Sequence, residues 1–201
     1  MIQLHGVRMS RASRCMWMLE ELGLPYESVP VSFVGDVQKP EYKKLNPNAR
    51  IPTLVDEDGS VVWESLAINL YLVEKYDGGF RPKHAAERGQ LLQWSFWAMT
   101  EIEPGLIQAF LQRVMLPEAQ RDASLGDAGE AQLQRPLAVL DAELGRRPWL
   151  LGDRFSAADL NVASVLGIAP IARVDLAKFP NVARWLGEAT ERPAAKRAFG
   201  R

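Results

Sequence analysis

The fold is decided by one stretch of the chain, Ile51-Pro52-Thr53-Leu54-Val55-Asp56-Glu57-Asp58-Gly59-Ser60-Val61-Val62-Trp63-Glu64-Ser65. Two short apolar runs, 53–55 and 61–63, flank Asp58-Gly59, a dipeptide that favours tight turns between antiparallel strands. Ser65 stands where a helix N-cap is expected, because an apolar periodic run over residues 66–76 follows it. The stretch therefore predicts a β-hairpin that leads directly into a helix.

Upstream of the hairpin, strand and helix patterns alternate. Apolar residues outline a first strand within residues 2–7, and a helical stripe over 12–22 ends at Gly23, which predicts a helix C-terminus there. Val29, Val31 and Phe33 alternate as in a half-buried strand, and residues 39–48 predict a short helix or loop. The order β-α-β-α-β-β-α predicts a mixed sheet with helices on its faces, the α/β thioredoxin-like arrangement, over residues 1–77.

Downstream of the hairpin the strand patterns fade. Residues 78–83 are expected to form a linker, and residues 84–201 an all-α helical bundle. A long helical pattern covers 84–115, with a kink or break expected at Pro104-Gly105. A polar loop is expected over 117–129, followed by helices over 133–144, 155–168, 183–189 and 194–198.

Composition narrows the class of protein. The chain has 201 residues, 47% of hydrophobic types, and 24 basic against 25 acidic side chains, so no strong field favours nucleic acid or an anionic membrane. No uncharged apolar run approaches the roughly 20 residues of a membrane span. A single cysteine, Cys15, and the lack of a secretory pattern favour the cytoplasm. The two histidines are far apart, so no metal site is expected.

Three features of residues 1–77 can carry chemistry. Ile51-Pro52 precedes a strand, where a proline is also structurally ordinary. Glu64-Ser65 precedes a helix whose first N–H groups and positive dipole end suit a carboxylate, while the Glu64 charge suits an ammonium group. Ser10 or Ser13, in the turn before the first helix, is either a helix cap or a hydroxyl that donates to a bound thiolate.

Together these residues resemble the cytosolic glutathione transferase family. The resemblance covers nearly the whole chain in the right order and is carried by Ser10-Arg11-Ala12-Ser13-Arg14, Leu19-Glu20-Glu21-Leu22-Gly23-Leu24-Pro25-Tyr26-Glu27, Leu45-Asn46-Pro47-Asn48-Ala49-Arg50-Ile51-Pro52-Thr53-Leu54, Glu64-Ser65-Leu66-Ala67-Ile68 and Arg147-Pro148-Trp149-Leu150-Leu151-Gly152-Asp153-Arg154-Phe155-Ser156-Ala157-Ala158-Asp159.

The resemblance implies how glutathione is held. Pro52 would be a cis proline, with the Ile51 backbone pairing with the cysteinyl part of glutathione. Glu64 and Ser65 would hold the γ-glutamyl end, and Lys39 and Arg50 would lie near the glycyl carboxylate.

The resemblance also assigns roles to side chains outside the glutathione grip. Ser10 falls where the serine-type classes keep the hydroxyl that activates the thiol. Ser156 and Asp159 match a structural capping box. Cys15 falls on the apolar stripe of the first helix, which favours a buried, inert thiol.

The resemblance implies a glutathione transferase that joins glutathione to a small, mostly apolar electrophile, and a two-fold homodimer. The co-substrate pocket would be lined by Met9, Arg11, Trp97, Glu101 and Phe110.

Three alternatives stay open: a maleyl-type isomerase, a glutathione-dependent disulfide reductase and a glutathione-binding module without turnover. An anion-binding role for some of Arg8, Arg11 and Arg14 would favour the isomerase.

Overall fold

The structure, a computed structural model, describes residues 1–200 and divides into two compact units. The first unit holds residues 1–81 and the chain from Arg192 onward, and the second unit holds residues 82–191.

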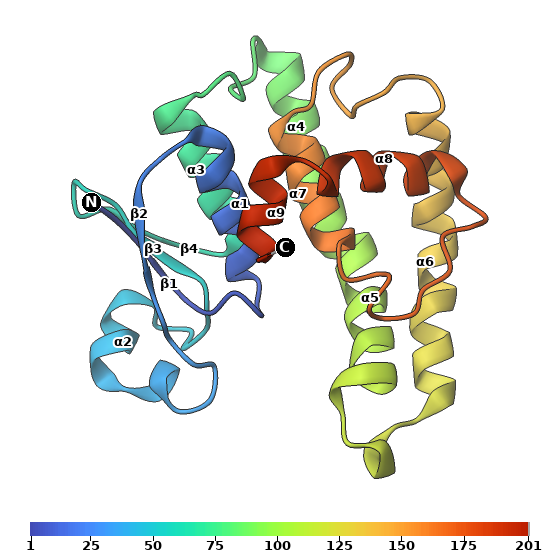
Figure 1. Ribbon diagram of the computed structural model, residues 1–201, viewed down its shortest axis with the longest axis horizontal. Helices are drawn as coiled ribbons and strands as arrows, with labels where there is room; N and C mark the ends of the chain where they lie inside the picture. Colours follow the sequence, from blue (N-terminus) through green and yellow to red (C-terminus); the bar gives the residue numbers. More distant parts are fainter. Residues whose placement is uncertain (201) are drawn as a thin grey trace. The chain divides into compact units, whose positions relative to one another are not determined.

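The first unit is built on a four-stranded mixed sheet in the order β2-β1-β3-β4 (Figure 1). The strands are β1 (Ile2–His5), β2 (Tyr26–Val29), β3 (Thr53–Val55) and β4 (Val61–Trp63). β1 and β2 are parallel, while β3 is antiparallel to both β1 and β4. The predicted hairpin turn forms at Asp58-Gly59, where Gly59 adopts a φ of 83° that few residues other than glycine tolerate. The predicted mixed sheet is confirmed.

Helices cover both faces of this sheet. α1 (Ala12–Leu22) and α3 (Ser65–Tyr76) pack together on one face, and α2 (Pro40–Leu45), preceded by the 3-10 turn η1 (Asp36–Gln38), lies on the other (Figure 1). Ile2 and Leu4 of β1 are buried under α1. Gly23 ends α1 in the left-handed conformation, as its place in the sequence predicts.

Two local predictions in the first unit are wrong. The second strand ends at Val29, because Pro30 has no N–H to donate to a sheet ladder, and Val31 instead joins a small core with Val37 and Tyr42. Ser65 is the first residue of α3, and the N-cap position belongs to Glu64.

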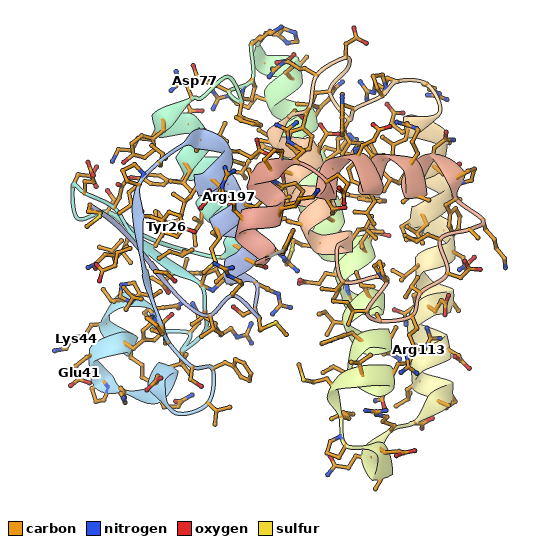
Figure 2. All side chains as sticks on the ribbon, viewed as in Figure 1. Tyr26, Glu41, Lys44, Asp77, Arg113 and Arg197 are labelled. Atoms are coloured by element: carbon orange, nitrogen blue, oxygen red, sulfur yellow. The ribbon has the colours of Figure 1, made fainter. Side chains whose placement is uncertain are left out.

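The chain returns to the first unit at its last helix, α9 (Pro193–Phe199), which packs on α1. The Phe199 ring meets the Trp17 ring edge-to-face at 5.7 Å, and Arg197, labelled in Figure 2, donates to Glu20 at 2.6 Å. The expected helical domain over 84–201 therefore loses its last helix to the first unit, a long-range pairing that no local pattern reveals.

The second unit is all helical in residues 82–191, with α4 (Ala85–Trp97), α5 (Glu103–Phe110), α6 (Ala123–Leu144), α7 (Ala157–Leu166) and α8 (Pro180–Thr190). Two π-helical turns, η2 (Ala98–Ile102) and η3 (Leu111–Met115), interrupt the long pattern, and Pro104 lies in the first turn of α5.

The predicted polar loop is too long, since it contains the 3-10 turn η4 (Glu118–Gln120) and Asp122 then caps α6 by accepting from the Ser124 N–H at 2.9 Å. The predicted capping box before α7 is present, with the Ser156 N–H donating to Asp159 at 2.9 Å.

Within residues 1–200, every helix is too short or too polar to cross a bilayer.

Candidate functional site

The candidate site of the first unit lies where three strand ends meet at one edge of the sheet. The register pairs His5 with Thr53 and Thr53 with Trp63, so β1 ends, β3 begins and β4 ends in one row. The residues that follow or precede these positions, Gly6, Pro52 and Glu64, consequently share this edge. A Cβ built on Gly6 would lie 3.5 Å from the Ile51 Cβ, which shows how closely the first strand approaches the loop before β3.

The loop before β3 is held from below by side chains of α2 and its end. The Ile51-Pro52 bond is cis, and Pro52 is buried. The Arg50 carbonyl accepts from the Tyr42 hydroxyl at 2.7 Å and from Asn46 Nδ2 at 2.8 Å. Both groups also reach the Thr53 hydroxyl, at 2.9 and 3.2 Å. This network fixes the backbone on both sides of Ile51-Pro52, and no local sequence pattern predicts it.

The start of α3 combines an unusual backbone with buried polar atoms. Glu64 is exposed and adopts a φ of 72°, rare for a residue other than glycine and costly unless its surroundings enforce it. Ser65 is only 2% exposed. Within residues 1–200, α3 has no side-chain cap at its N-terminus, so its first N–H groups and positive dipole end are available to an anion. The Glu64 carboxylate beside them suits a cation.

The two candidate hydroxyls differ in access. Ser10 is half-buried, and its hydroxyl donates to the Val7 carbonyl at 2.6 Å while accepting from the Ala12 N–H at 3.1 Å. Ser13 is 9% exposed and its hydroxyl donates to the Ser10 carbonyl at 2.9 Å. Neither serine occupies the N-cap position of α1, which belongs to Arg11. Of the two residues, Ser10 is the less buried.

The three arginines near this turn have different surroundings. Arg14 is 4% exposed and its Nη1 lies 3.5 Å from the Ser65 hydroxyl oxygen. Arg11 is exposed, and Arg8 lines a separate pocket beside β2. The proximity of Arg14 to Ser65 joins two residues 51 positions apart, which no local sequence pattern predicts.

Cys15 is fully buried, as its position on the apolar stripe predicts. Its thiol lies 3.4 Å from the Ser65 carbonyl oxygen, and burial raises its pKa far above the ordinary value although the charge of Arg14 opposes this. The thiol therefore stays protonated at neutral pH and is a poor nucleophile.

The remaining predicted site residues occupy less constrained places. Lys39 is exposed and pairs with Asp36 at 2.7 Å, the Arg50 side chain is exposed, and Met9 is 91% exposed at the β1–α1 turn. In the second unit, Trp97 ends α4, Glu101 lies in η2 and Phe110 ends α5. Among residues 1–200, no three histidine, cysteine or acidic side chains gather as a metal site would require.

Comparison with known proteins adds three kinds of similarity. Family models described as the N-terminal and C-terminal domains of glutathione S-transferase match residues 8–75 and 102–193. The chain is 30% identical to glutathione S-transferase GstB of Escherichia coli K12, over 98% of this chain and 97% of the relative. It is also 32% identical to the disulfide-bond oxidoreductase YfcG of the same organism, over 99% and 94%. The theta class glutathione S-transferase of Xanthomonas axonopodis pv. citri, solved with glutathione bound, superposes with a TM-score of 0.92 at 32% identity, covering 98% and 96%.

Proposed function

Because the chain belongs to the glutathione S-transferase family, we propose that it binds glutathione at the strand ends of its first unit and activates the thiol for attack on a small, mostly apolar electrophile. The observation that carries this proposal is the row formed by Gly6, the cis Ile51-Pro52 bond and Glu64 at one sheet edge. Residues 1–77 form the glutathione-binding domain, and residues 84–191 contribute the co-substrate site.

The two ends of glutathione carry different charged groups, and we assign each end to different residues of the first unit. Glu64 binds the γ-glutamyl ammonium, and the Ser65 hydroxyl with the first N–H groups of α3 binds the carboxylate on the same carbon. The backbone of Ile51 pairs with the cysteinyl part, which places the sulfur toward Ser10. Lys39 and Arg50, both exposed, attract the glycyl carboxylate.

The proposed chemistry is stabilisation of a thiolate. A free thiol titrates near pH 8.5 and is mostly protonated at neutral pH, and each unit by which its pKa falls is worth about 1.4 kcal/mol. The Ser10 hydroxyl turns from the Val7 carbonyl to donate to the sulfur, and the thiol proton passes to solvent. The thiolate then forms a carbon–sulfur bond with the electrophile, whose leaving group departs with its electron pair.

The residues proposed to contact the co-substrate are Met9 and Arg11 in the first unit and Trp97, Glu101 and Phe110 in the second.

The experiment compares Ser10→Ala with Ser13→Ala. Both variants and the parent protein are titrated with glutathione by calorimetry and assayed with 1-chloro-2,4-dinitrobenzene from pH 6 to 9. Ser10→Ala is expected to lower kcat about 10- to 100-fold, to move the pH profile upward and to leave glutathione affinity nearly unchanged. If Ser13→Ala has that effect and Ser10→Ala does not, the hydroxyl is misassigned. Tight glutathione binding without turnover of any electrophile or disulfide would instead indicate a binding module.

A second function, glutathione-dependent disulfide reduction, is supported by the 32% identity to YfcG. A turnover assay with glutathione, hydroxyethyl disulfide and glutathione reductase distinguishes disulfide reduction from glutathione transfer. Transfer consumes glutathione as a conjugate, whereas reduction oxidises it to its disulfide. The maleyl-type isomerase stays an alternative, and the same assay with a maleyl substrate would detect it.

We also propose that the protein works as a cytoplasmic homodimer. Its edge strand β4 leaves Val61 and Trp63 40% and 41% exposed, which is apolar surface that a partner could cover. Light scattering coupled to gel filtration tests this, with Trp63→Glu expected to shift the mass toward that of a monomer.

A further inference from the structure

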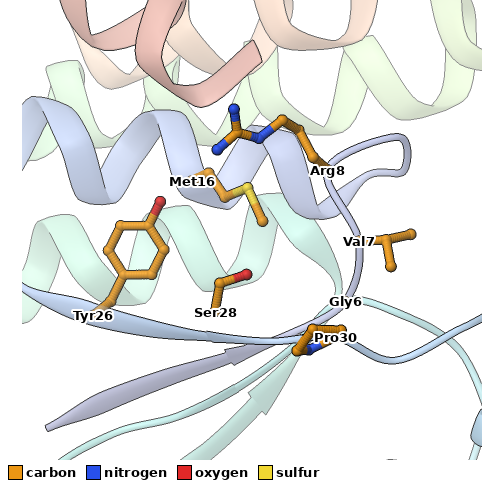
Figure 3. Close-up of a pocket in the computed structure, with 7 residues that line it drawn as sticks. All are labelled: Gly6, Val7, Arg8, Met16, Tyr26, Ser28 and Pro30. Carbon is orange, nitrogen blue, oxygen red and sulfur yellow. The ribbon is translucent and has the colours of Figure 1, made fainter. Parts of the chain in front are cut away.

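A second concave site lies in the first unit, between β2, the end of β1 and α1 (Figure 3). It has a volume of about 190 Å³ and is lined by Gly6, Val7, Arg8, Met16, Tyr26, Ser28 and Pro30. An apolar cavity of roughly 150 Å³ holds a benzene molecule, so this space is large enough for one aromatic ring.

This pocket borders the proposed glutathione site at Gly6, but its other lining residues lie on the β2 side of β1, away from the loop before β3. The sheet order β2-β1-β3-β4 puts Tyr26 and Ser28 on one side of β1 and the Ile51-Pro52 loop, which precedes β3, on the other. Tyr26 and Ser28 are paired with Ile2 and Leu4, so their side chains leave the sheet on the face that carries α1. A ligand here would not contact the cis-proline loop.

The pocket carries one cation that the rest of the described chain does not neutralise. Within residues 1–200, the Arg8 guanidinium makes no hydrogen bond or ion pair, and Figure 3 shows it extending over Met16 at the rim. The exposed Arg8 side chain lies beside Gly200, since a Cβ built on Gly200 would lie 2.6 Å from Arg8 Nη1. A guanidinium can present two parallel N–H groups to a carboxylate.

Hydroxyl groups add donors on the β2 wall. Burial and the charge of Glu20 raise the pKa of Tyr26, although Arg8 acts in the opposite direction, so the phenol keeps its proton at neutral pH. Ser28 adds a second hydroxyl, exposed toward the pocket (Figure 3). The Tyr26 hydroxyl donates to Glu20 at 3.5 Å, and Glu20 also accepts from Arg197 at 2.6 Å, an ion pair that reduces the repulsion between Glu20 and an incoming anion.

The rest of the lining is apolar and suits a flat ring. The Met16 thioether, the Pro30 ring and the Tyr26 ring line the space beneath Arg8 (Figure 3). Contacts between sulfur and an aromatic ring are favourable.

We infer that this pocket binds a small aromatic monocarboxylate, with the carboxylate on Arg8 and the ring between Met16 and Pro30, independently of glutathione.

The test uses benzoate as the probe and the full-length protein. Benzoate is titrated into ¹⁵N-labelled protein, and saturable chemical-shift changes are expected at Val7, Arg8 and Ser28, with Kd in the millimolar range. Arg8→Gln should weaken binding about tenfold or more, because a charge-assisted hydrogen bond is lost. Arg135→Gln, the same change at an exposed arginine of α6, should leave Kd unchanged. Benzamide, which lacks the charge, should bind at least tenfold more weakly than benzoate.

Two further measurements test location. Ser28→Phe, at an exposed strand position, should fill the pocket and abolish benzoate binding while the far-UV circular dichroism is retained. Saturating S-hexylglutathione should leave the benzoate Kd unchanged. Displacement by S-hexylglutathione, equal weakening by Arg8→Gln and Arg135→Gln, or no saturable binding would each overturn the inference. None of these results depends on whether the protein turns over glutathione.

Discussion

Glu21 of α1 and Arg192, the residue before α9, are joined by two hydrogen bonds of 2.6 and 2.8 Å across 171 positions of sequence. The Glu21 side chain is only 7% exposed and also accepts from the Trp17 indole N–H at 3.0 Å. Removing one partner of such a pair leaves the other charge poorly solvated.

Arg192→Gln is therefore expected to lower the free energy of unfolding by about 2 kcal/mol, measured by urea denaturation. Arg197→Gln is the control, because the Arg197 side chain is 56% exposed and its loss should cost less than about 1 kcal/mol. Equal effects of the two substitutions would show that the burial of the Glu21–Arg192 ion pair does not increase its contribution to stability.

Two helices of the second unit approach each other through glycine. A Cβ built on Gly129 of α6 would lie 2.7 Å from the Gly105 carbonyl oxygen and 2.8 Å from the Ala109 nitrogen, both backbone atoms of α5. Gly129→Ala should force the helices apart and lower the free energy of unfolding by about 2–3 kcal/mol in thermal or urea melts.

Gly187→Ala, in α8 where nothing lies within 4 Å of the new Cβ, is the matched control. It should raise stability by up to about 1 kcal/mol, because alanine has the higher helix propensity. A loss of stability at Gly187 would mean that the effect at Gly129 is not steric.

Protonation of Asp56 should lower the free energy of unfolding at acidic pH. This carboxylate is buried, which by itself raises its pKa, but hydrogen bonds from Lys75, Tyr71 and Tyr76 lower the pKa to about 2. Because the folded pKa lies below the unfolded value, the stabilisation is complete above about pH 4 and disappears as the pH falls toward 2.

The loss attributable to Asp56 should be about 2 kcal/mol. Urea melts at pH 6, 4 and 3 measure it, and Asp56→Asn should be less stable at pH 6 but show a shallower decline below pH 4. A decline as steep as that of the parent protein would assign the acid sensitivity to other carboxylates.

Two substitutions at Glu64 distinguish the effect of its charge from the cost of its backbone conformation. Glu64→Ala removes the charge but keeps a side chain at a φ of 72°, whereas Glu64→Gly removes both. Both variants should bind glutathione at least tenfold more weakly by calorimetry. Glu64→Gly should nevertheless be about 1 kcal/mol more stable than Glu64→Ala. Equal stability would show that this backbone conformation carries no cost.

Sequence patterns predicted those parts of the fold that depend on neighbouring residues. Asp58-Gly59 identified the hairpin and Gly23 the end of α1, because turn chemistry is local. The register that aligns Gly6, Pro52 and Glu64 was not predictable, since it depends on strands that are far apart in the chain. The network beneath Arg50 was missed for a similar reason. Asn46 and Tyr42 are ordinary loop and helix residues until the fold turns both toward one carbonyl.

Because α9 packs on α1, the first unit is built from two separate segments of the chain, the first and the last to be synthesised. A fragment cut after Arg81 would expose the side of Trp17 that Phe199 covers, and would leave the Glu21 carboxylate without Arg192. The thioredoxin-like unit is therefore not a domain that can be excised as one continuous segment of the chain. During biosynthesis the first unit can reach its final packing only after residues 82–191 have been made.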